Sequence, residues 1–127
     1  MQVLFGTTDV TSVVQEKSYK VDKVAKYKAW KNGNNVEVWS NLHYKVEGSF
    51  TAVFIPDLTM SYSDFKTALD AVTTARGVTT LSLTVNNDDG ALATINAHVT
   101  INFEPMIDLK NGSNIIFKKA TITVKEC

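Results

Sequence analysis

The feature that most constrains this fold is the alternation of side chains from Val36 to Ile55. Apolar residues occupy most even positions of this stretch, and polar or charged residues occupy most odd ones. A two-residue period is that of a strand with one buried and one solvent-facing side. At roughly 3.3 Å per residue an unbroken strand of this length would exceed about 60 Å. We therefore expect the strand to bend or to change sheets near Gly48.

The remaining elements predict a fold that is mainly β (α+β), an antiparallel β-sandwich or barrel with one packed α-helix. The helix is expected from Ser61 to Val72, where Phe65 and Leu69 belong to one apolar stripe and a serine can cap the first turn. Two short strands, or a strand and an arm, are expected at the N-terminus over Met1–Phe5 and Val10–Val14. The later strands are predicted at Val78–Asn86, Ala91–Phe103 and Asn114–Val124, with turns at Asn87–Gly90 and Glu104–Ser113.

Residues 1–127 are expected to form a single domain from which a hairpin around residues 19–46 projects. Its turn is predicted at Asn32–Asn35, and the preceding strand is rich in lysine. Exposed lysines on an edge strand prevent unwanted strand pairing, and the same residues also suit a binding patch. The long strand carries more apolar residues than a small core needs, so its outer part is expected to pack on a neighbouring subunit. The candidate interface residues are Tyr27, Trp30, Val36, Val38 and Trp39.

The composition argues against several classes of function. Thirteen basic residues balance thirteen acidic ones, so no net charge favours nucleic acid or an anionic membrane. Cys127 is the only cysteine, which excludes an internal disulfide and a cysteine metal cage. His43 and His98 are placed by parity on polar strand faces, so no metal or cofactor is expected. The Asn86–Gly90 stretch is rich in side-chain oxygens, but it lacks the spacing of a calcium-binding loop. We therefore interpret it as an ordinary hairpin turn.

No catalytic motif is present, and we expect no enzyme. The first residues lack the basic and apolar regions of a signal peptide, and no apolar run reaches transmembrane length. The alternative function is an OB-like nucleic-acid or small-ligand binding module, because lysines and aromatic residues share the hairpin. Trp39 and Tyr44 have opposite parity, however, and fit one stacking platform only if the strand is bulged. Nucleic-acid binding is therefore the less favoured alternative.

The order of elements resembles small tail and baseplate proteins of tailed bacteriophages and of prophages, of the tail-tube or distal-tail type. The resemblance is carried by the strand ending at Lys45–Phe54, the helix Ser61–Val72 and the hairpin Leu81–Phe103. It implies a structural virion protein, present in the virion or in the bacterial cytoplasm before assembly. The implied partners are further copies of the chain, in a ring or tube, and other tail proteins. The resemblance implies no cofactor and no membrane partner.

Overall fold

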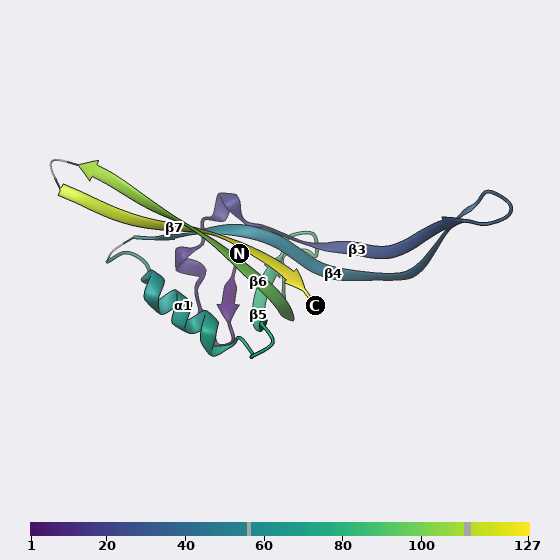
Figure 1. Ribbon diagram of the computed structural model, residues 1–127, viewed down its shortest axis with the longest axis horizontal. Helices are drawn as coiled ribbons and strands as arrows, with labels where there is room; N and C mark the ends of the chain where they lie inside the picture. Colours follow the sequence, from purple (N-terminus) through teal and green to yellow (C-terminus); the bar gives the residue numbers. More distant parts are fainter. Residues whose placement is uncertain (56, 111–112) are drawn as a thin grey trace.

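The computed structural model describes residues 1–55, 57–110 and 113–127, and it describes the side chains of these residues except at positions 39, 41, 105–110 and 113–118 (Figure 1). This part of the chain is mainly β with a single α-helix, which confirms the predicted fold class. The elements are β1 (Val3–Phe5), β2 (Thr8–Asp9), the 3-10 turns η1 (Thr11–Val13) and η2 (Glu16–Ser18), β3 (Lys20–Lys31), β4 (Glu37–Phe54), α1 (Tyr62–Ala71), β5 (Val78–Val85), β6 (Ala91–Lys110) and β7 (Ser113–Glu126).

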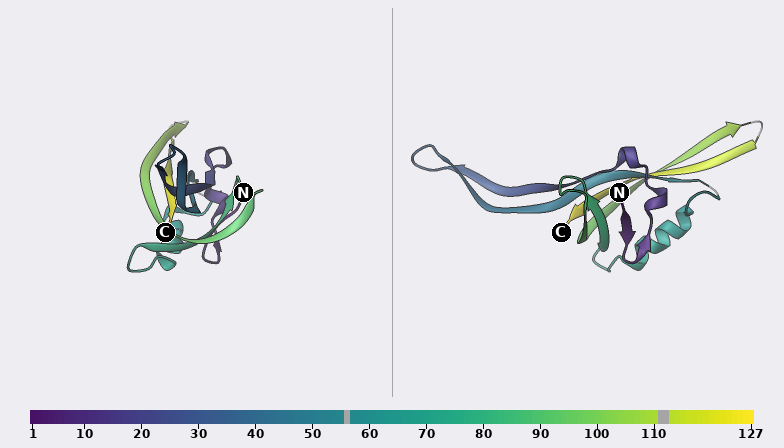
Figure 2. Two further views of the ribbon diagram at one scale, coloured as in Figure 1. Left: turned by 90° about the vertical axis from the view of Figure 1, so that its right-hand side faces the viewer. Right: turned by 180° about the vertical axis from the view of Figure 1, so that it is seen from behind.

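The described strands form one antiparallel sheet of seven strands in the order β2-β1-β5-β6-β7-β4-β3. The sheet coils around the core, as the end-on view in Figure 2 shows. The edge strand β3 comes back to β5, an inner strand of the same sheet. There the backbone N–H of Asn86, just after β5, donates to the carbonyl of Val21 in β3 at 2.9 Å. The architecture is therefore a single coiled sheet that meets itself, closer to a barrel than to two stacked layers.

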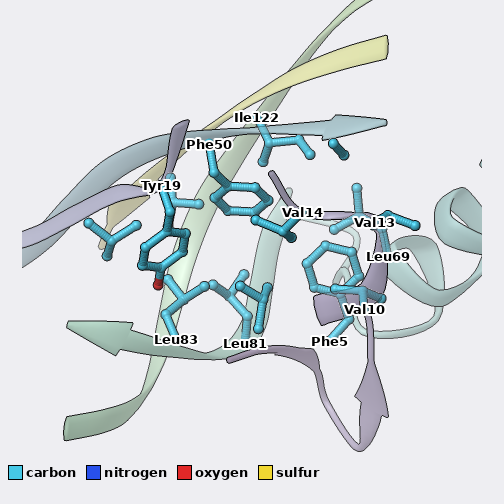
Figure 3. Packing of buried hydrophobic residues seen from close by; sticks show 14 of the residues in the cluster. Phe5, Val10, Val13, Val14, Tyr19, Phe50, Leu69, Leu81, Leu83 and Ile122 are labelled. Atoms are coloured by element: carbon cyan, nitrogen blue, oxygen red, sulfur yellow. The ribbon is translucent and has the colours of Figure 1, made fainter. Parts of the chain in front are cut away.

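Aromatic rings organise the core under this coiled sheet (Figure 3). Phe65 of α1 packs edge-on against Phe5 and Phe54, with ring centroids 5.0 and 5.2 Å apart. Tyr19 packs beside Phe50 at 5.8 Å, and its hydroxyl donates to the buried carbonyl of Thr84. Inward positions of β5 and β7 complete the core in the predicted alternation, with these residues fully or almost fully buried: Leu81, Leu83, Val85, Ala120, Ile122 and Val124.

The helix forms where the sequence predicts it. Ser61 is the N-cap, and its side chain accepts a hydrogen bond from the N–H of Asp64 at 3.2 Å. Phe65 and Leu69 are its buried residues, so the helix covers one side of the core. Of the two alternatives for the N-terminus, a second strand at Val10–Val14 is wrong, and a strand followed by an arm agrees with the structure. This segment contains η1 and buries Val10 and Val13, because short apolar residues fill the end of the coiled sheet without needing a further strand.

Gly48 does not interrupt β4, which runs unbroken through it. The strand changes neighbours there instead. From residue 37 to Ser49 it pairs with β3, and from Glu47 onward it pairs with β7. A Cβ at Gly48 would lie 2.0 Å from the carbonyl oxygen of Lys20, so glycine allows the two backbones to approach each other.

The turn expected over Glu104–Ser113 is also wrong over most of its length. β6 continues to Lys110, and its register with β7 runs from Glu104 opposite Lys119 to Lys110 opposite Ser113. Pro105 is accommodated because β5 pairs with β6 only as far as His98, which leaves a neighbour on one side of β6 at the proline. Asn111 and Gly112, the expected centre of this turn, lie outside the described residues.

Candidate functional site

The most distinctive surface is the outer part of the β3–β4 hairpin, residues 24–45, which we call the ribbon. It extends away from the body as a ladder of two strands (Figure 1). β7 pairs with β4 only from Glu47 onward, and the carboxylate of Glu126 accepts from the N–H of Val46 at 3.1 Å, at the base of the ribbon. Both long edges of the ribbon therefore lack a paired strand in the described part of the chain. A two-stranded hairpin alone is marginally stable in water.

Local hydrogen bonds shape the tip of the ribbon. The side-chain oxygen of Asn32 accepts from the N–H groups of Asn34 and Val36 at 2.9 and 3.1 Å. Asn35 adopts a positive φ of 63°, a conformation that asparagine tolerates better than most residues. The Asn-rich sequence between the two strands thus specifies a tight reversal, as predicted.

Polar contacts anchor the base of the ribbon to the body. The side chain of Asn87 exchanges two hydrogen bonds with the backbone of Lys23, at 2.7 and 2.9 Å. Ion pairs of 2.8 Å join Lys23 to Asp88 and Lys26 to Glu47. Because these charges are partly exposed, each pair contributes little to stability, and their main effect is to orient the hairpin.

A β-bulge divides the ribbon in two. Between Lys26 and Lys28 β3 advances by two residues while β4 advances by three, from His43 to Ser40. A bulge in β4 was the condition for Trp39 and Tyr44 to belong to one stacking platform, and β4 contains this bulge between the two residues. Beyond it Ala29 lies opposite Trp39 and Trp30 lies opposite Val38.

Apolar side chains are exposed along the ribbon to an unusual degree. Ten large apolar residues of the described chain are exposed, and six of them lie in this 22-residue segment. Tyr44 is 61% exposed, and Trp30 and Leu42 are each 50% exposed. Large contiguous apolar surfaces are rare on proteins that work as monomers, and they usually mark interaction sites. The six residues are Val24, Tyr27, Trp30, Val36, Leu42 and Tyr44.

The five candidate interface residues all belong to the ribbon, but they do not share one face. Tyr27 lies on the side of β3 that continues from buried Val21, whereas Trp30 lies on the opposite side. Val38 is half-buried opposite Trp30, and Val36 is exposed beside the turn. Trp39 pairs with Ala29 through its backbone, and its side chain lies outside the described residues. The ribbon therefore presents apolar groups on both faces.

Tyr44, Leu42 and Val24 were not among the candidate interface residues, although they are exposed on the ribbon. Their even spacing on β4 suggested burial for Tyr44 and Leu42. The signal that identifies them is the length of the strand, because a strand that outruns its core leaves its apolar positions in solvent.

An open cleft lies on the body, near the base of the ribbon. Its volume is about 730 Å³. Asp9 and Glu16 bring carboxylates to it, and no lysine or arginine is among the described residues that line it. Hydrogen bonds from Thr11 hold the pKa of Asp9 below its ordinary value, so this carboxylate stays charged at neutral pH. The cleft is lined by Met1, Gln2, Asp9, Thr11, Glu16, Tyr19, Thr84, Asn86 and Gly90.

The histidines do not form a metal centre with other described side chains. His43 is on the ribbon and His98 is on β6, and both are exposed. Among the described residues, no group of three or more His, Cys, Asp or Glu side chains is placed to hold a metal ion. None of the described helices has the length and apolar character needed to cross a membrane.

Comparison of the chain with protein-family models, with curated proteins and with solved structures finds no match.

Proposed function

We propose that this chain is a structural protein of a bacteriophage or prophage tail, and that it assembles into rings or a tube through its β-surfaces. The observation that carries the proposal is the ribbon, with six exposed large apolar residues on two strands that no third strand flanks in the described chain. Leaving such a segment in water forfeits roughly 25 cal/mol for each Å² of apolar surface that a partner would cover. Homo-oligomers with rotational symmetry are the usual means of covering it.

The strand edges support the β-surface part of the proposal. An unpaired edge presents N–H and C=O groups that a strand from another chain can satisfy. β4 has such an edge along the ribbon. β6 has another beyond His98, where it extends with β7 at the opposite end of the molecule (Figure 1). A body with extensions at two opposite ends suits an assembly in which each copy touches two neighbours.

The tail-protein part of the proposal is supported by the order of elements. A long strand precedes one helix, and a long antiparallel hairpin follows it, as in the tail proteins that the sequence resembles. The proposal assigns no catalytic step to this chain.

A second candidate function is single-strand nucleic-acid binding on the ribbon. The observation that favours it is the presence of Lys28 and Lys31 beside the exposed rings of Tyr27 and Trp30. Single-strand binding proteins combine basic groups with aromatic stacking platforms in this way. The two rings lie on opposite faces of β3, however, which separates the platform, and the neutral chain lacks a general attraction for phosphate.

Size-exclusion chromatography with light scattering, followed by negative-stain microscopy, tests the proposal. We expect particles whose mass is a multiple of 14.0 kDa, with rings or tubes visible at high protein concentration. A strict monomer at every concentration would contradict it.

Fluorescence anisotropy with labelled single strands tests the second candidate. We expect no measurable binding at physiological salt, and a micromolar, salt-sensitive dissociation constant would favour the nucleic-acid function instead.

A further inference from the structure

Charge is divided unequally between the ribbon and the rest of the molecule. Residues 24–45 hold four lysines against Glu37 alone, a formal charge of +3. Because the whole chain is neutral, the remainder carries −3. Lys28 and Lys31, in the outer half of the ribbon, form no ion pair in the described part of the chain. The tip of the ribbon is therefore basic as well as apolar.

Two acidic side chains of the body line the cleft, Asp9 and Glu16. Residues 1–16 contain Asp9 and Glu16 and no lysine or arginine. Residues 78–104, which include β5 and its turn into β6, likewise contain acidic residues and no lysine or arginine. These two segments meet at the cleft, whose lining includes Gln2 and Asp9 from one and Thr84 and Gly90 from the other. The cleft thus presents the carboxylates of Asp9 and Glu16, which are opposite in charge to the lysines of the ribbon.

We propose that the ribbon of one copy docks at the cleft of a second copy, so that Lys28, on one face of the ribbon, and Lys31, on the other, lie near the carboxylates of Asp9 and Glu16. This inference rests on the proposed assembly function and names the surface that receives the ribbon. The contact is heterologous, because two different surfaces of the same chain meet in it. Repeated from copy to copy, such a contact closes into a ring or continues as a filament, and it ends at a two-fold dimer only where each ribbon docks at the cleft of the other copy.

Charge decides between this contact and the symmetric alternative. In a symmetric contact that packs ribbon on ribbon, two segments of charge +3 would repel each other. In the heterologous contact opposite charges meet, which steers the encounter and fixes the orientation. Exposed apolar residues, with Trp30 on one face and Tyr44 on the other, supply the buried area in either case. Only the heterologous contact satisfies the lysines as well.

Charge reversal on each surface tests the inference. The ribbon variant is Lys28→Glu with Lys31→Glu, and the cleft variant is Asp9→Lys with Glu16→Lys. We expect each variant alone to raise the concentration at half-assembly by at least about tenfold in light scattering, since like charges then face each other. An equimolar mixture of the two should assemble again, because the acidic ribbon of one variant fits the basic cleft of the other.

Two further variants guard against loss of fold. Asp9→Asn with Glu16→Gln retains an acceptor for the N–H of Thr11 and removes only the charge, so weaker assembly in this variant is also expected. Asp64→Lys with Asp70→Lys makes the same charge change on exposed α1 positions and should assemble like the unchanged chain.

The outcomes separate this inference from the proposed function. If the unchanged chain assembles and both cleft variants assemble equally well, the cleft is not the receiving surface and the inference is wrong, while the assembly function stands. The inference is also wrong if the equimolar mixture of the two charge-reversed variants does not assemble in light scattering. If the unchanged chain never assembles, the proposed function fails with it.

Discussion

The two ends of β4 should respond to substitution in opposite ways. Phe50, in the body, is 1% exposed and packs against the ring of Tyr19. Val38, on the ribbon, is half-buried and has a single cross-strand neighbour of known register, Trp30. Truncating a buried phenylalanine to alanine typically costs about 3 to 5 kcal/mol. A cross-strand pair contributes only about 0.2 to 1 kcal/mol.

Phe50→Ala is therefore expected to lower the free energy of unfolding by about 3 to 5 kcal/mol, a large share of the roughly 5 to 15 kcal/mol of an ordinary domain. Val38→Asp should lower it by about 1 kcal/mol or less and should prevent assembly, because it buries a charge in the proposed contact. Urea unfolding at a concentration where the chain is monomeric gives the first quantity, and light scattering at high concentration gives the second.

The reasoning is refuted if Val38→Asp unfolds the monomer as thoroughly as Phe50→Ala does. The ribbon and the body would then form one cooperative core, and the exposed apolar surface would not be an independent contact. The matched control is Thr123→Asp, an exposed position on β7 that β4 and β6 flank on both sides, which should change neither stability nor assembly appreciably.

Three further predictions concern the body. Gly48→Ala should destabilise the fold by about 1 to 3 kcal/mol or more, because the new Cβ meets the Lys20 carbonyl, whereas Gly33→Ala, with open space around it, should change the urea midpoint little. Ser61→Ala should cost about 1 kcal/mol through loss of the helix cap, and Ser63→Ala should cost less; equal effects in thermal unfolding would contradict the capping role. Burial first, and then the charge of Asp22, raise the pKa of Tyr19 above its ordinary value of 10.0, so the folded state favours the neutral phenol. The stability from this shift is complete below pH 10.0 and falls as the pH rises above it, and a Tyr19→Phe variant should show a shallower alkaline decline in stability; an unchanged decline would contradict the assignment.

Much of the body could be predicted because each local signal agrees with the packing. Leu81 and Leu83 alternate with polar residues and are buried, and Ser61 caps the helix that the apolar stripe of Phe65 and Leu69 indicates. The long alternation of β4 predicted a strand that outruns the core. These signals depend on nearest neighbours in the chain, so the sequence alone contains them.

The remaining features depend on contacts between distant residues. The bulge opposite Lys26 and Lys28 has no glycine to mark it, and it alters which residues of β4 lie opposite those of β3. The continuation of β6 through Pro105 depends on where β5 stops pairing, which the proline itself does not reveal. The cleft is lined by residues from positions 1–19 and from positions 84–90. No local sequence pattern predicts that these two segments lie side by side.

The mass of a variant with a shortened ribbon tests the central claim most directly. Deleting residues 25–31 and 37–44 joins Val24 to Lys45, a directly opposed pair, through the native turn at 32–36. Because the core lies entirely outside the deleted segments, the shortened chain should unfold cooperatively with nearly the stability of the full chain. Light scattering should then give a monomer at concentrations where the full chain forms rings or tubes. A shortened chain that assembles as the full chain does would show that the ribbon is not the contact.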